Sequence, residues 1–392
     1  MRTLLKNVLL LDAAREYEAA DLLVEGERIA AVGPDLAAED AAVIDLGGRT
    51  VMPAFLDAHV HTRPQPVPFS DEEPILEAFV YNGLSGAKDL GILDNIPLEG
   101  YLAWLRTQDA PGRLRVATAG RYIDVAGGYG MGPFPELKWG LEIETPAQAA
   151  EMVRYQFRAG VNGIKIGMND GGMSPILGKL SGAHIRAITD TAHELGLWST
   201  AHVYAVEDLR LLVENGIGEA AHTPHDRIID DDIIRRMVDR RIPMTSTIGN
   251  VTEDSPPSPH CPPQYTPEAF RAKQLRDKAV TIENLKRFYA MGGTVNVGTD
   301  FMRSKDGVAE AMIPVSELRQ LRQDVGMSLR DVIRAGTVNA AASCGFSDEG
   351  AIRPGNRANL IAFDGRLGDD FAQLLDLRFV MNRGVVIRPL AG

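Results

Sequence analysis

Two histidines separated by one residue, His59 and His61, end an apolar stretch that begins at Val51. In a β-strand, side chains two residues apart point to the same side. We therefore expect both imidazoles to project together from a strand end, with Val60 turned into the packing behind them. Two imidazoles held on a rigid strand are the beginning of a metal site, and a half-buried pair at a sheet edge is the alternative.

The elements that would position these histidines are short apolar segments that alternate with helical segments. This rhythm predicts a parallel sheet with crossover helices. Residues 181–195, for example, place Ile185, Ile188 and Ala192 on one helical face. Eight strands are the number that a closed (β/α)8 TIM barrel needs. The candidate strands are residues 51–57, 83–89, 114–119, 163–167, 198–202, 219–222, 242–247 and 294–298.

The two ends of the chain differ from the middle in their sequence pattern, which predicts short β-strands separated by glycine-containing turns. Because the termini of a domain often lie close together, we expect the ends to form one small β-sandwich. The expected division is a first sandwich segment at 1–50, the barrel at 51–345 and a second sandwich segment at 346–392. Two longer segments, 123–144 and 251–267, interrupt the barrel rhythm, and we expect them to be lids or binding loops.

Composition excludes several classes of function. The 392 residues carry a net charge of −12 without a basic tract, so nucleic acid and anionic membranes are not expected as partners. No apolar run approaches the roughly 18 residues of a membrane span. The two cysteines, Cys261 and Cys344, fit a reducing compartment, so we expect a cytoplasmic protein. The expected partners are a small-molecule substrate and further copies of the chain in a homo-oligomer.

Barrel enzymes carry their functional residues at the carboxyl ends of the strands. His202 follows from the fifth candidate strand, His222 from the sixth and Asp300 from the eighth. With the two histidines of the first strand, these side chains would converge on one rim. Imidazole and carboxylate ligands that leave open positions suit zinc or a similar divalent ion.

The fourth candidate strand contributes a lysine, Lys165, between Ile164 and Ile166. Burial would lower the pKa of its amine and leave a neutral nucleophile. Beside two metal ions, such an amine can add carbon dioxide and become a carbamate, whose two oxygens can bridge the ions. A buried or snorkelling amine without this chemistry is the alternative.

Taken together, these motifs resemble the amidohydrolase superfamily over nearly the whole chain. The likeness is to the binuclear branch with a carbamylated lysine after the fourth strand. Residues 55–61 resemble its opening metal motif, and residues 298–300 resemble its eighth strand. Residues 163–166, followed by 170–172, resemble the lysine strand of Xaa-Pro dipeptidase-like members, which are related to imidazolonepropionase.

The resemblance implies two divalent ions, Zn²⁺ or else Mn²⁺ or Co²⁺, and a carbamate on Lys165 derived from carbon dioxide. A hydroxide bridging the ions would attack an amide carbon, and Asp300 would act as general base and then as general acid. A strand-end residue that caps a helix is the alternative for Asp300. One ion would be held by His59, His61, Lys165 and Asp300, and the other by Lys165, His202 and His222.

Five further residues are candidates for substrate binding. Tyr129 stands where similar enzymes often carry a histidine after two glycines, and simple packing is its alternative. Tyr204 lies two residues beyond the fifth-strand histidine and would point to the same side. His225 follows a ligand strand closely, although a supporting or loop position suits it as well. Arg227 and Arg303 lie just past ligand strands and could pair with a substrate carboxylate, unless they are solvated surface residues.

The sequence therefore predicts a metal-dependent hydrolase that cleaves an amide-type C–N bond. A dipeptide such as Xaa-Pro or an N-acyl amino acid is the expected substrate. A lactone, carbamate or cyclic amide on the same site is the main alternative. A mononuclear deaminase would not need Lys165, and a non-catalytic binding barrel would not need the proton shuttle of Asp300.

Overall fold

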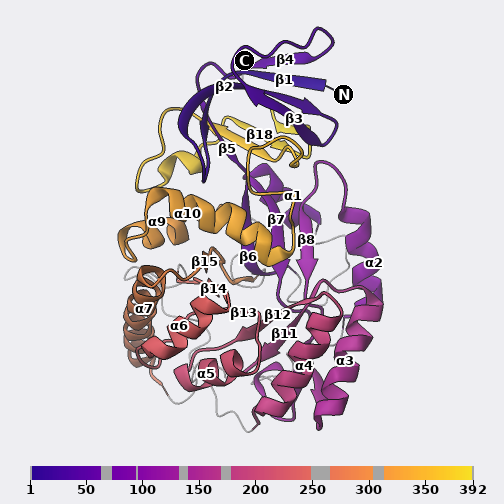
Figure 1. Cartoon of the computed structure of the whole chain (residues 1–392), viewed down its shortest axis with the longest axis vertical. Coiled ribbons are helices and arrows are strands. Elements are labelled where there is room, and N and C mark those ends of the chain that lie inside the picture. The colour runs from indigo at the N-terminus through magenta and orange to yellow at the C-terminus, as the bar shows by residue number, and fades with distance from the viewer. Residues whose placement is uncertain are drawn as a thin grey trace.

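The computed structural model describes residues 2–62, 73–93, 96–131, 140–168, 178–248, 265–302 and 313–390. One end of the molecule is a sheet that contains both chain ends, and the rest is a parallel barrel surrounded by helices (Figure 1). The predicted combination of a TIM-like barrel with a β-sandwich from both chain ends is confirmed. The boundaries of the barrel at residues 50 and 345 remain our proposal.

Strand β1 is central to the terminal sheet. It pairs antiparallel with β2 and parallel with both β4 and β5. Strand β5 then pairs antiparallel with β17, which joins the two ends of the chain in one mixed sheet. The terminal sheet has a buried cluster of its own, which includes Leu5, Leu10, Leu360 and Phe379. The strands are β1 (Arg2–Leu11), β2 (Glu16–Glu25), β3 (Arg28–Gly33), β4 (Ala42–Asp45), β5 (Thr50–Pro53), β17 (Leu360–Phe363), β18 (Phe379–Asn382) and β19 (Val385–Arg388).

The barrel strands belong to two separate parallel ladders. The first runs β16-β6-β7-β8, and the second runs β10-β9-β11-β12-β13-β14-β15. A backbone hydrogen bond of 2.9 Å from Ala58 N to Val297 O joins them at one seam. The strands are β6 (Phe55–His61), β7 (Leu84–Asp89), β8 (Arg115–Thr118), β9 (Tyr122–Val125), β10 (Gly140–Ile143), β11 (Gly163–Gly167), β12 (Trp198–His202), β13 (Glu219–Ala220), β14 (Met244–Thr245), β15 (Val295–Asn296) and β16 (Phe301–Met302).

Helices follow the barrel strands and cover the outside of the barrel (Figure 1). In α4, Ser181 caps the first turn, and Ile185, Ile188 and Ala192 form the buried face that the sequence predicts. None of the helices within the described ranges is long and apolar enough to cross a membrane. They are α1 (Glu73–Tyr81), α2 (Leu98–Gln108), α3 (Pro146–Ala159), α4 (Gly182–Glu194), α5 (Val206–Glu214), α6 (Asp231–Asp239), α7 (Pro267–Ala290), α9 (Val315–Gln323), α10 (Leu329–Arg334), η4 (Ala335–Asn339) and α11 (Ala340–Cys344), with short turns η2 (Tyr129–Met131) and η5 (Ala372–Leu375).

Two details of the sequence prediction are wrong. The segment 51–57 is not one strand, because the chain leaves the terminal sheet after β5 and enters the barrel with β6. The segment 123–144 is not a loop throughout. Its first residues complete β9 and its last form β10, which pairs with β9 in parallel. In the second predicted loop, residues 251–264 lie outside the described ranges.

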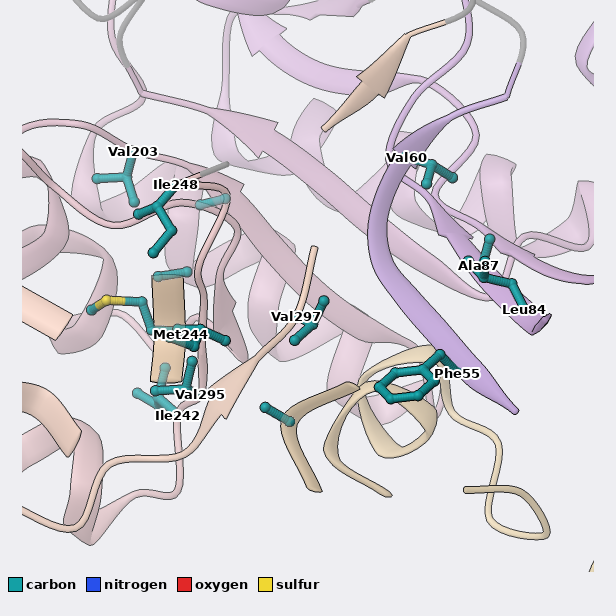
Figure 2. Packing of buried hydrophobic residues seen from close by; sticks show 14 of the residues in the cluster. Phe55, Val60, Leu84, Ala87, Val203, Ile242, Met244, Ile248, Val295 and Val297 are labelled. Carbon is teal, nitrogen blue, oxygen red and sulfur yellow. The ribbon is translucent and has the colours of Figure 1, made fainter. Parts of the chain in front are cut away.

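The apolar core places the strand ends rigidly. Val60 is fully buried, as predicted, on the opposite side of β6 from the two histidines. Phe55 and Val60 line β6, with Leu84 and Ala87 on the neighbouring β7, as Figure 2 shows. Close packing of this kind leaves little freedom to the backbone that carries the polar residues.

Candidate metal centre

His59 and His61 lie at the end of β6, and both are buried. The Nδ1 atom of His59 lies 3.0 Å from the carbonyl oxygen of Ala221, and that of His61 lies 3.3 Å from the carbonyl oxygen of Gly91. A carbonyl oxygen can only accept, so each Nδ1 carries the proton that it donates. In the neutral rings, each Nε2 therefore keeps a lone pair, as a metal ligand requires.

Asp300 lies directly against these lone pairs. Its Oδ1 is 3.2 Å from His59 Nε2 and 3.3 Å from His61 Nε2. Burial lowers the pKa of His59 well below its usual value, so this ring is neutral at pH 7.

The three ligand atoms of His59, His61 and Asp300 lie within 4.8 Å of one another. Acceptor atoms this close repel one another unless a proton or a cation lies between them. The histidine protons are already used on the backbone carbonyls. A divalent cation therefore fits this donor set, which has the composition of a transition-metal site.

The other two predicted histidines lie beside the first pair. The ring centroids of His59 and His222 are 4.6 Å apart, and those of His202 and His222 are 4.7 Å apart. His222 Nδ1 lies 2.9 Å from the hydroxyl of Thr247. Within the residues that the structure describes, the buried Nε2 of His202 has no hydrogen-bond partner. The four histidines thus converge as the strand order predicts.

Lys165 is fully buried in β11. Among the described residues, its Nζ has no hydrogen-bond partner, which is costly for a charged amine. Burial lowers its pKa to about 7, so roughly half of the amine is uncharged at pH 7. Burial lowers the pKa of His202 well below its usual value, and the positive charge of Lys165 adds to the lowering at both His59 and His202.

Two tyrosines border the histidine cluster. Tyr129 stacks on His202 with ring centroids 3.8 Å apart and an angle of 10° between the planes. Gly167 makes room for this ring, because a Cβ there would lie 2.8 Å from Tyr129 Cδ1. Tyr204 meets the edge of His202 at 4.5 Å and the ring of His222 at 4.8 Å. Both tyrosines therefore lie beside the histidine cluster, and their role in substrate binding stays a prediction.

His225 contacts the outer side of Tyr204, with ring centroids 4.4 Å apart. Its Nε2 lies 3.7 Å from Asp277, which also pairs with Lys273 on the same helix, α7. These two α7 residues were not predicted from the sequence. Their spacing of four residues is that of an ordinary ion pair within a helix. This spacing does not indicate that the helix packs beside the histidines.

The two predicted arginines are placed differently. Arg227 is 44% exposed, and it pairs with Asp230 at 3.1 Å and with Glu207 at 3.5 Å. These contacts direct its guanidinium along the surface, so a role toward substrate stays a prediction. Arg303 lies outside the described residues.

Comparison with known proteins agrees with this geometry. A family model described as the amidohydrolase family matches residues 108–391. The chain belongs to the amidohydrolase family. It is therefore a metal-dependent hydrolase, and the donor set of His59, His61 and Asp300 is the part of the site that supports a divalent metal ion most directly.

Curated relatives match this amidohydrolase over short stretches only. An adenine deaminase from Deinococcus radiodurans is 49% identical over 47 residues, which are 12% of this chain and 9% of the relative. A dihydroorotase from Bacillus cytotoxicus is 40% identical over 63 residues, which are 16% of this chain and 15% of the relative. The matched stretches thus span a small part of either relative.

Solved structures match over the full length. A prolidase complexed with N-methylphosphonate-L-proline has a TM-score of 0.81 and 22% identity, and the match covers 99% of this chain and 100% of that one. A Xaa-Pro dipeptidase with bound methionine has a TM-score of 0.81 and 19% identity, covering 98% and 99%. Phenylurea hydrolase B has a TM-score of 0.76 and 18% identity, covering 98% and 96%. At these identities the likeness is one of fold.

Proposed function

We propose that this amidohydrolase cleaves the amide C–N bond of a small substrate, a Xaa-Pro dipeptide or an N-acyl amino acid. The observation that carries the proposal is the carboxylate of Asp300 held against the imidazoles of His59 and His61. A hydrolase needs both a metal site and a group that moves a proton, and here one carboxylate can serve both. Two of the solved structures with this fold are named for the Xaa-Pro bond.

The residues proposed to hold metal are His59, His61 and Asp300 for one ion and His202 and His222 for a second, with Lys165 between them as a carbamate. When bound, divalent ions would acidify water and polarise the bond under attack. The carbamate would form when neutral Lys165 Nζ adds to carbon dioxide, which makes one N–C bond and releases one proton. The product nitrogen carries no charge, so the buried side chain would no longer need an ionic partner for an ammonium group, and its oxygens would be available to metal ions.

Asp300 would carry the proton through the reaction. Its side chain is about a quarter exposed, so a bound substrate would reach it while Oδ1 faces the histidines. As a carboxylate, it would accept the proton of the attacking water and then deliver that proton to the leaving nitrogen. An amide nitrogen is a poor leaving group until it is protonated, so the second transfer matters as much as the first.

Metal stoichiometry tests this assignment against the deaminase alternative. We expect metal analysis of the reconstituted protein to give about two ions per chain, as in binuclear hydrolases, and activity to follow the metal content. One tightly bound ion together with release of ammonia from an aminated heterocycle would support a deaminase. Full activity in metal-free protein would contradict the proposal.

A substrate panel tests the bond that is cleaved. Metal-reconstituted protein should hydrolyse Xaa-Pro dipeptides or N-acyl amino acids faster than lactones, carbamates and cyclic amides. The cyclic amide has a specific argument in its favour, since the dihydroorotase match is one of the stronger short matches. Preferential turnover of a cyclic amide or a lactone would overturn the dipeptide proposal and leave the metal chemistry intact.

Tyr129 is the proposed wall of the substrate pocket, together with Tyr204 and His225. Replacement of Tyr129 by Ala removes the ring stacked on His202. We expect KM to rise by up to about tenfold with a smaller change in kcat, since such a ring contributes about 0.5–1.5 kcal/mol. Tyr129→Phe keeps the ring and is the matched control. Equal kinetics for the Ala variant and the wild type would remove Tyr129 from the pocket.

A further inference from the structure

Asp57 lies in β6, two residues before His59, and its side chain is fully buried. Its Oδ1 accepts hydrogen bonds of 3.0 Å from the backbone N–H of His59 and from that of Thr299. Its Oδ2 accepts a bond of 2.6 Å from the Thr299 hydroxyl. One carboxylate therefore binds both the β6 strand and the segment that follows β15.

The segment bound by Asp57 ends in Asp300, whose backbone is left-handed with a φ of +55°. Residues other than glycine adopt this conformation rarely, although Asp and Asn do so most readily. Hydrogen bonds hold the backbone on both sides of the peptide that joins Thr299 to Asp300. Thr299 is held by Asp57, and the N–H of Asp300 donates to the carbonyl oxygen of His59 at 2.8 Å. This backbone conformation directs the carboxylate of Asp300 back to the two histidines.

The position of Asp57 in the barrel explains why such a connection is needed. The β6 strand belongs to one ladder, and β11, β12 and β13, which lead to Lys165, His202 and His222, belong to the other. The proposed metal site therefore spans the seam between two ladders. At this seam the carboxylate of Asp57 adds two hydrogen bonds from Thr299 to the few that the backbone makes there, and its third bond holds the backbone of His59 within β6.

We propose that Asp57, acting through Thr299, is a positioning residue that sets the distance between Asp300 and the histidine pair. Asp57 is fully buried and its carboxylate binds His59 and Thr299, so it would act through these two residues. The proposal rests on the proposed function, because it assigns Asp57 to the geometry of the same site. A purely structural role, in which the carboxylate only satisfies buried N–H groups, is the alternative.

The test replaces Thr299 by Val, which keeps the shape of the side chain and removes the hydroxyl donor. We expect kcat to fall by about 10- to 100-fold with little change in KM, since misplacement of a catalytic group by about 1 Å has effects of this size. Binding of Co²⁺ to the metal-free protein should weaken by about tenfold or more, as for loss of other groups that orient metal ligands. Thr299→Ser keeps the hydroxyl donor, so its kcat and its Co²⁺ affinity should both lie within about twofold of the wild-type values.

Thr245→Val is the matched control. The Thr245 hydroxyl also donates a 2.6 Å bond to a buried carboxylate, that of Glu219, but it does not bridge the seam to Asp300. The Thr245→Val variant should lower the melting temperature as much as Thr299→Val does, while leaving kcat and Co²⁺ affinity nearly unchanged. If both Val variants lose only melting temperature, or if Thr299→Val matches the wild type throughout, Asp57 has no positioning role.

Two further readouts keep the outcome clear. Should Thr299→Val not fold, Thr299→Ala replaces it, since the smaller side chain also removes the hydroxyl that donates to Asp57. The same losses of kcat and Co²⁺ affinity are then expected, and their absence would refute the proposal. Co²⁺ affinity and its visible absorption spectrum need no substrate. If the wild type cleaves no compound in the panel, the proposed function fails while these measurements still decide the role of Asp57.

Discussion

Replacement of Asp300 by Asn should lower kcat by about 10²- to 10⁴-fold, the range that loss of a general acid–base group produces. Asn is nearly the same size and is also tolerated in the left-handed conformation, so the φ of +55° can be kept. The amide oxygen can still face His59 and His61, but it cannot accept a proton from water at neutral pH. The loss should therefore fall on turnover more than on KM, as measured by steady-state kinetics.

Metal content must be measured on the same preparation of Asp300→Asn, because a ligand has also been weakened. A variant that keeps most of its metal and loses turnover supports the proton-transfer role. Asp277→Asn is a suitable control, since Asp277 lies at the edge of the site beside His225 but not against the metal donors. Its effect on kcat should be below about tenfold. Unchanged turnover in Asp300→Asn would show that another group moves the proton.

The residues at the ligand-bearing strand ends could be predicted because short patterns in the sequence indicate them. His59 and His61 share a face through the two-residue period of a strand. The parallel barrel then brings distant strand ends to one rim, and His202, His222 and Asp300 are found beside the first pair. Family, fold and metal dependence followed from these few positions, and the family match and the architecture confirm them.

The partners of these side chains could not be predicted, because they depend on tertiary packing. His59 and His61 donate to the carbonyl oxygens of Ala221 and Gly91, and any residue type carries such a group. Asp277 reaches His225 only because α7 packs beside the site. The β9 and β10 strands were mistaken for a loop because each has only four residues and the glycines near Tyr129, which do form a turn, follow β9 directly.

Replacement of Lys165 by Ala should lower turnover by at least about 10³-fold and reduce the bound metal, since the proposed carbamate serves both ions. The methyl group leaves a cavity beside the donors, and a short carboxylic acid such as propionate could occupy it. Its two oxygens would replace those of the carbamate, so partial rescue that depends on acid concentration is expected. Rescue by the corresponding amides or alcohols, which supply no anionic bridge, should be absent.

The second buried lysine of the barrel provides an internal control for the carbamate. Lys88 is as fully buried as Lys165, but it pairs with Glu219 and Ser343, and an ammonium group held in an ion pair has no lone pair to add to carbon dioxide. Protein equilibrated with ¹³C-labelled bicarbonate should therefore show one carbamate resonance, which Lys165→Ala abolishes. Because burial is equal at the two positions, the difference in reactivity would come from the missing ionic partner alone. An alanine variant that keeps its metal and its turnover would instead show that Lys165 is a packing residue of the barrel interior.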